Sequence, residues 1–132
     1  MKRILILILA VITPVLVCSE SLKVDKLRAT KMSISSLDSN GDWNYSGLIE
    51  SNVLCVLNYD KSKIIIYSTD IQEYDVVSVD VQQKGNKINF KCVDKEGLKC
   101  GIILEADSSN DEIIDITIYY TDMIIYYRTR VI

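Results

Sequence analysis

The feature that most constrains the fold is a regular alternation of apolar stretches with short polar turns along the chain. The stretches run for roughly five to nine residues and are rich in Ile, Val, Leu and Tyr, the side chains that favour strands. None has the 3.6-residue periodicity of an amphipathic helix. The expected strands cover residues 30–35, 53–58, 63–68, 73–82, 87–93, 98–106, 113–120 and 123–132. The pattern therefore predicts an all-β protein.

The connections between these strands determine the expected topology. Most neighbouring strands are separated by only a few residues, which favours an antiparallel up-and-down meander of about eight strands. Residues 64–66 are all isoleucine and apolar on both faces, so an open sheet would leave an apolar surface in water. We expect the meander to close into a small barrel, with a two-layer β-sandwich as the alternative. Residues 36–46, which hold the single tryptophan, are expected to form a polar loop.

The N-terminus has the pattern of a secretory signal peptide. Lys2 and Arg3 precede an apolar run over residues 4–17, which is shorter than the ~20 residues that a membrane-spanning helix needs. We expect residues 1–19 to be a signal peptide that is cleaved after Ser19. The protein would then be periplasmic or secreted, with no membrane span after cleavage.

One alternative to a freely exported protein is a lipoprotein anchored through Cys18. That motif has a small residue directly before the cysteine, whereas Val17 is bulky and branched. Cleavage after Ser19 is therefore the preferred reading. Residues 20–132 are expected to form a single β-barrel domain and to be a monomer.

The charge and the lack of histidine exclude several classes of function. The chain has a formal net charge of −3, and loss of the cationic signal peptide makes the remainder more acidic, so no nucleic-acid partner is expected. Histidine is the commonest general base and a common metal ligand, and the chain has none. Residues 38–42 begin like a calcium loop, but Trp43 and Ile49 stand where that loop needs glycine and glutamate. We therefore expect no enzymatic activity, no cofactor and no metal.

A short turn brings two cysteines together in the predicted hairpin. If residues 95–97 form a three-residue loop with Gly97 in the left-handed conformation, Cys92 lies opposite Cys100 on the apolar face. Opposite residues of antiparallel strands are ~4.5–5.5 Å apart at Cα, which is within reach of a disulfide. An exported protein meets an oxidising compartment, so a structural disulfide is the preferred reading, and two reduced core thiols are the alternative. Cys55 is expected to be a buried free thiol.

The last hairpin carries the most informative surface of the sequence. A turn at Thr121 and Asp122 directs residues 116, 118, 125 and 127 inward, so the neighbouring side chains face outward. The outward group has the composition of an interface and is the expected ligand or partner face. Its members are Thr117, Tyr119, Ile124, Tyr126, Arg128 and Arg130. The alternative is that the tryptophan loop or the N-terminal segment covers this face.

Two resemblances accompany these residues. Gly41-Asp42-Trp43 resembles the Gly-x-Trp motif of lipocalin-like (calycin) barrels, in which the tryptophan packs beneath an arginine of the last strand. This resemblance implies that Trp43 closes the barrel against Arg128 or Arg130. Over most of its length the chain also resembles small exported β proteins of unknown function from gut Bacteroidetes and their phages. The shared features are a leading tryptophan loop, a hydrophobic hairpin, a CxDxxGxxC turn and a tyrosine-rich last hairpin, and they imply no activity.

These observations predict an exported, non-enzymatic binding protein for a small apolar ligand or a glycan. The alternative is an inhibitor or protein-interaction module that acts through a loop or a strand edge. The two differ in structure: a ligand carrier should have a hollow interior, whereas an inhibitor should have a packed interior and a protruding, well-ordered loop.

Overall fold

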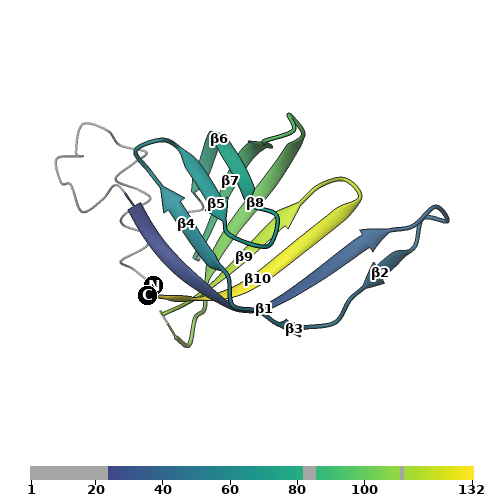
Figure 1. The fold of residues 1–132 in the computed structure, drawn as a ribbon, viewed down its shortest axis with the longest axis horizontal. Coiled ribbons are helices and arrows are strands. Elements are labelled where there is room, and N and C mark those ends of the chain that lie inside the picture. Colours follow the sequence, from purple (N-terminus) through teal and green to yellow (C-terminus); the bar gives the residue numbers. More distant parts are fainter. Residues whose placement is uncertain (1–23, 82–85, 111) are drawn as a thin grey trace.

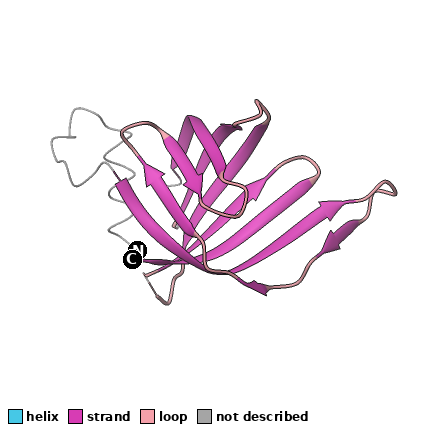
Figure 2. Ribbon diagram, in the orientation of Figure 1, coloured by secondary structure: helices cyan, strands magenta, loops and turns pink. Residues whose placement is uncertain are grey.

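The computed structural model describes residues 24–81, 86–110 and 112–132. The expected signal peptide and Cys18 lie outside the described residues. Every regular element in the described ranges is a β-strand (Figure 2). Within those ranges, no helix is long and apolar enough to cross a membrane.

Eight of the ten strands form a closed antiparallel barrel (Figure 1). In the order of their pairing these are β1 (Val24–Leu37), β4 (Leu54–Asn58), β5 (Lys63–Ile66), β6 (Gln72–Val81), β7 (Lys87–Asp94), β8 (Lys99–Ala106), β9 (Ile113–Tyr119) and β10 (Met123–Val131). Each pairs with the next along the chain, and β10 returns to pair with β1 from Leu27↔Val131 to Ser36↔Met123. The predicted meander and its closure into a barrel are confirmed, and the sandwich alternative is not what forms.

The alternation of side chains along the strands fills the barrel interior. On the last hairpin, Ile116 and Ile118 are fully buried, and Tyr127 is 2% exposed. The predicted pairs Ile118↔Ile125 and Ile116↔Tyr127 are both present. Burying a side chain of this size contributes roughly 1.5–3 kcal/mol, so this core supplies most of the stabilisation of the barrel. The other fully buried interior side chains include Leu27, Cys55, Ile66, Ile88 and Ile102.

A β-hairpin extends from one end of the barrel, where the sequence predicts a polar loop. Strand β1 has 14 residues and continues past the end of β4 while it stays paired with β10 as far as Ser36. The strands β2 (Trp43–Tyr45) and β3 (Ile49–Glu50) fold back along its other edge. The register pairs Leu37 with Trp43 and Met32 with Ile49. Figure 1 shows this hairpin pointing away from the barrel. We call residues 34–49 the arm.

The loop prediction for residues 36–46 was wrong because the polar residues of this segment form a tight turn between two paired strands. Gly41 adopts a positive φ of 85°, which glycine tolerates without strain. The backbone N–H of Asp38 donates to the Asp42 carbonyl at 2.9 Å, and this closes the turn. Polar residues on either side of such a turn can still pair as strands.

Candidate functional site

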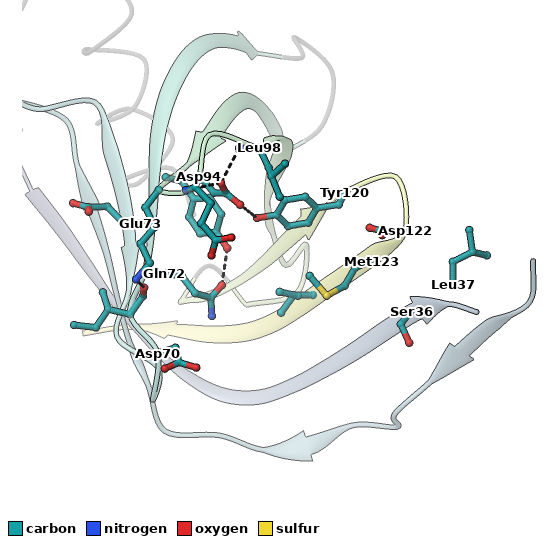
Figure 3. A pocket seen from close by; sticks show the side chains of 15 residues that line it. Ser36, Leu37, Asp70, Gln72, Glu73, Asp94, Leu98, Tyr120, Asp122 and Met123 are labelled. Carbon is teal, nitrogen blue, oxygen red and sulfur yellow. Dashed lines mark hydrogen bonds between the residues drawn. The ribbon is translucent and has the colours of Figure 1, made fainter. Parts of the chain in front are cut away.

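A cleft opens at the end of the barrel from which the arm extends. Its walls come from the β5–β6 loop, the β7–β8 turn, the β9–β10 turn and the base of the arm, and its volume is ≈ 550 Å³ (Figure 3). We call it the mouth cleft. Its lining residues are Ser36, Leu37, Asp70, Ile71, Gln72, Glu73, Tyr74, Asp94, Lys95, Glu96, Leu98, Tyr120, Asp122, Met123 and Ile125. Pockets of this size hold small ligands or an anchoring side chain of a partner.

Asp94 joins two turns at the rim of the mouth cleft. Its Oδ1 accepts hydrogen bonds from the backbone N–H groups of Glu96 at 3.0 Å and Leu98 at 2.9 Å. Its Oδ2 accepts the Tyr120 hydroxyl at 2.8 Å, as Figure 3 shows. Burial opposes ionisation, but the hydrogen bonds from Leu98 and Tyr120 outweigh it and lower the pKa of Asp94. The carboxylate therefore acts as a structural acceptor that fixes this rim.

A second network forms the floor of the mouth cleft. The Tyr74 hydroxyl donates to Gln72 Oε1 at 2.6 Å. The Gln72 amide nitrogen donates to the Tyr127 hydroxyl at 2.9 Å and to Ser68 Oγ at 3.0 Å. The donor hydrogens of Gln72 and Tyr74 are thus used in bonds within the protein. A ligand can therefore use these two side chains only as hydrogen-bond acceptors.

The charge around the mouth cleft is predominantly negative. Lys95 is the single cation among the lining residues, and its ammonium donates to the Ile71 carbonyl at 2.6 Å. The carboxylates that line the cleft are Asp70, Glu73, Asp94, Glu96 and Asp122. A hydrogen-bond donor or a neutral polar group suits this opening better than an anion does.

The tip of the arm is a well-bonded turn. Asp38 Oδ1 accepts the backbone N–H groups of Asn40 and Asp42, each at 2.9 Å, and Asp38 Oδ2 accepts the Asn44 amide at 3.2 Å. The bonds from Asp42 first, and from Asn44 and Asn40 with it, lower the pKa of Asp38. At the base, the Leu37 N–H donates to the Asp122 carbonyl at 2.9 Å, which ties the arm to the rim of the mouth cleft.

The arm presents an unusual number of apolar side chains to solvent. Tyr45 is 65% exposed, Leu48 53% and Trp43 48%. Ile34, Leu37 and Ile49 are also exposed. Among the described strands, β2 and β3 pair with β1 alone, so their outer edges are open. Exposed apolar groups beside an open edge are typical of interaction surfaces.

The structure places Trp43 far from the arginines that the calycin resemblance assigned to it. Trp43 pairs with Leu37 near the tip of the arm, whereas Arg128 pairs with Lys31, about 20 Å away at ~3.3 Å per residue along β1. Arg128 bonds Asp107 at 2.9 Å and Arg130 bonds Glu112 at 3.4 Å, both at the opposite end of the barrel. The expected stacking of Trp43 on Arg128 or Arg130 is therefore wrong for this structure, because β1 carries the tryptophan beyond the barrel.

The outward face of the last hairpin is arranged as the alternation predicts. Tyr119 is 40% exposed, and Ile124 and Tyr126 are half-buried. The Tyr126 hydroxyl donates to Asp115 at 2.7 Å, and burial together with this bond raises the pKa of Tyr126 to about 12. Arg128 and Arg130 are engaged in their ion pairs. The role of this face as a ligand or partner site stays a prediction.

The cysteine pair has the predicted register. Cys92 pairs with Cys100, and Gly97 has a φ of 86° in the turn between them. Both are free thiols in this structure, as is the buried Cys55. Burial raises the pKa of Cys92 to about 12 and that of Cys55 to about 12, so neither is a reactive thiolate. The disulfide stays a prediction that rests on the confirmed register.

The mouth cleft and the arm could not be assembled from the sequence. Gln72, Asp94 and Tyr120 come from three different turns, and only barrel closure brings those turns together. The one usable local signal was the Asp-x-x-Gly turn at residues 94–97, which identifies the carboxylate as a turn acceptor. Within the described ranges, no group of three or more Cys, Asp or Glu side chains is placed to hold a metal ion.

No protein-family model matches the chain, and comparison with curated proteins and with solved structures gave no significant match.

Proposed function

We propose that the protein is an exported, non-enzymatic interaction module that engages a protein partner through the arm and the adjoining mouth cleft. The observation that carries this proposal is the exposure of six large apolar side chains on the arm, which add nothing to the barrel core. Apolar anchors of this kind, Trp and Tyr above all, supply much of the binding energy in protein interfaces.

The geometry of the arm supports the same proposal. Its tip is fixed by the hydrogen bonds to Asp38 and its base by the bond from Leu37 to Asp122. A surface that is ordered before binding loses less conformational entropy on association. The barrel interior is filled with side chains, which favours the interaction module over a carrier with an internal cavity.

Site-specific photocrosslinking tests the proposal. A photoreactive phenylalanine analogue replaces Tyr45 on the arm, and the same residue replaces Asp60 in the β4–β5 turn at the opposite end as the matched control. In the exported fraction of the native host, the arm position should give one discrete crosslinked partner that the control position does not. Trp43→Ser and Leu48→Ser in the same molecule should abolish the crosslink and leave the thermal unfolding temperature unchanged. Identical crosslinks from both positions, or crosslinks that survive the two substitutions, would refute the proposal.

A second candidate is a small ligand such as a glycan in the mouth cleft. Its support is the ≈ 550 Å³ volume and the carboxylates of Asp70 and Asp122 among the lining residues, whose oxygens are acceptors. Sugar hydroxyls are donors, and tyrosine rings pack well against sugar faces. Titration with neutral oligosaccharides should shift the backbone amide resonances of Gln72, Asp94 and Tyr120. Shifts that are confined to the arm would exclude this candidate.

A further inference from the structure

A second groove lies on the outer face of the barrel, across β6 to β9. Its volume is ≈ 570 Å³, and it shares only Tyr120 with the mouth cleft. We call it the outer groove. Its lining residues are Val77, Lys91, Cys92, Val93, Lys99, Cys100, Gly101, Tyr119, Tyr120 and Thr121. It does not overlap the arm, so what it binds is independent of the function proposed above.

Gly101 shapes the outer groove because it leaves space for the ring of Tyr119. Gly101 pairs with Tyr119 across β8 and β9, and a Cβ at Gly101 would overlap the ring and hydroxyl of Tyr119. The ring therefore lies across the glycine backbone instead of standing away from the sheet. The Tyr119 hydroxyl makes no hydrogen bond within the described part of the chain, so it can donate to a ligand.

A β-bulge adds an exposed valine to the lining of the outer groove. The pairing of β6 with β7 passes from Val76↔Cys92 to Ser78↔Lys91, and Val77 is the extra residue between them. A bulge redirects a side chain, and Val77 is 69% exposed here. Together with the half-buried Val93 it gives the outer groove an apolar floor.

Two lysines line the outer groove without a carboxylate partner. Lys91 lies opposite Gly101 and Lys99 lies opposite Val93, so the two are diagonal neighbours on one face, ~7–8 Å apart. Neither makes an ion pair with any residue that the structure describes, whereas Lys63 pairs with Glu73 and Asp75. Two like charges on neighbouring strands repel each other, and an anion between them removes that repulsion.

We propose that the outer groove binds an apolar monocarboxylate, a free aliphatic acid whose chain lies on Val77, Val93 and the Tyr119 ring. Its carboxylate accepts from the Lys91 and Lys99 ammonium groups, and the Tyr119 hydroxyl adds a third donor. The single anionic head fits two adjacent cations, and the apolar lining fits a chain better than it fits an inorganic anion.

An anionic lipid headgroup in a membrane surface could also place a negative charge between the two lysines, but the outer groove suits it less well than a free aliphatic acid. The neighbouring strand β6 carries Asp75 and Asp80 on its exposed outer positions. Those carboxylates repel a sheet of anionic headgroups but leave room for one small molecule between the two lysines.

Titration of the full-length exported protein with dodecanoate, below its micelle concentration, tests the proposal. Backbone amide resonances should shift around Gly101 and Val93 and saturate at one ligand per protein. Lys91→Gln combined with Lys99→Gln should weaken binding by roughly tenfold, since each exposed charge pair contributes a few-fold. Lys87→Gln is the matched control, because Lys87 lies on the same face of β7 but opposite Glu105, and it should leave the affinity unchanged. Gly101→Val should also weaken binding, because it displaces the Tyr119 ring while both lysines remain.

Several results would overturn the inference. One is equal affinity for dodecyltrimethylammonium, which has the same chain with the opposite charge. Another is unchanged dodecanoate affinity in the double lysine variant. This second result is decisive even if the Gly101→Val variant fails to fold. Shifts centred on the mouth cleft would place the ligand elsewhere. Binding to phosphatidylglycerol vesicles without binding to free dodecanoate would assign the outer groove to a membrane surface instead.

Discussion

Asp94 gives the sharpest test of how the mouth cleft is held together. Replacing Asp94 with alanine removes three hydrogen bonds, two within the β7–β8 turn and one to Tyr120. A hydrogen bond contributes about 0.5–1.5 kcal/mol net, and more when one partner is charged. Because the side chain is half-buried and water can replace part of the loss, we expect the free energy of unfolding to fall by about 2–3 kcal/mol. For a domain of this size that is a fall of roughly 8–12 °C in the unfolding temperature.

The assay is urea and thermal unfolding of Asp94→Ala beside two reference variants. Asp94→Asn keeps an oxygen for the two backbone N–H groups, so it should lose less stability than the alanine variant. Asp60→Ala removes an exposed carboxylate of the β4–β5 turn that makes no hydrogen bond within the described ranges, and it should change the unfolding free energy by under about 0.5 kcal/mol. Equal stability of Asp94→Ala and Asp60→Ala would refute the structural role of this carboxylate.

The pH dependence gives an independent check with a definite sign. The pKa of Asp94 is lower in the folded protein than its ordinary value of about 3.9, so the folded state favours the ionised form. The stabilisation is therefore complete above about pH 5 and is lost as the pH falls through the folded pKa. The stability difference between the native protein and Asp94→Ala should shrink as the pH is lowered from about 5 to about 2. A difference that stays constant over that range would mean that the hydrogen bonds do not depend on the charge.

Three further predictions concern the core, the cysteines and the N-terminus. Ile116→Ala should lower the free energy of unfolding by about 2–5 kcal/mol, because Ile116 is fully buried, and denaturant unfolding measures it. Protein exported to an oxidising compartment should have one titratable thiol, at Cys55, and a mass two hydrogens below the reduced value. Reduction should lower the free energy of unfolding by about 2–3 kcal/mol. Three titratable thiols would contradict the Cys92–Cys100 disulfide. Intact mass should place the first residue of the exported protein at Glu20, and a diacylglyceryl mass on Cys18 would make it a lipoprotein instead.

The sequence predicted the barrel because each hairpin is specified locally. A period-two pattern and a short turn determine the register of two adjacent strands, which is why Cys92↔Cys100 and Ile118↔Ile125 were predicted correctly. Closure followed from the same reasoning, since residues 64–66 have no polar face. The length of β1 was underestimated, because Val24–Leu37 alternates imperfectly across the shift between Ala29 and Lys31.

The candidate sites were harder to predict because they depend on three-dimensional relations between distant segments. The mouth cleft requires the turns that hold Gln72, Asp94 and Tyr120 to meet at one end of the barrel. The outer groove depends on the seating of Tyr119 over Gly101 and on the bulge at Val77. A glycine and a valine in strand-like sequence give no local sign of either role. The sequence did single out Tyr119, since its position in the alternation makes it face outward.

The arm is best understood from the different lengths of the paired strands. Strand β1 has 14 residues, whereas its barrel neighbour β4 has 5 and pairs only with Val24–Arg28, so the C-terminal part of β1 extends beyond β4. One edge of that part stays paired with β10 as far as Ser36, and the other edge is covered only by the short strands β2 and β3. Edge strands of 3 and 2 residues are marginal in water unless something packs against them. Its exposed Trp43, Tyr45 and Leu48 oppose solubility and add nothing to the core, so selection for stability alone would replace them with polar residues. Their presence on a hydrogen-bonded, open-edged hairpin is the physical argument for the proposal that the arm is used for contact with another molecule.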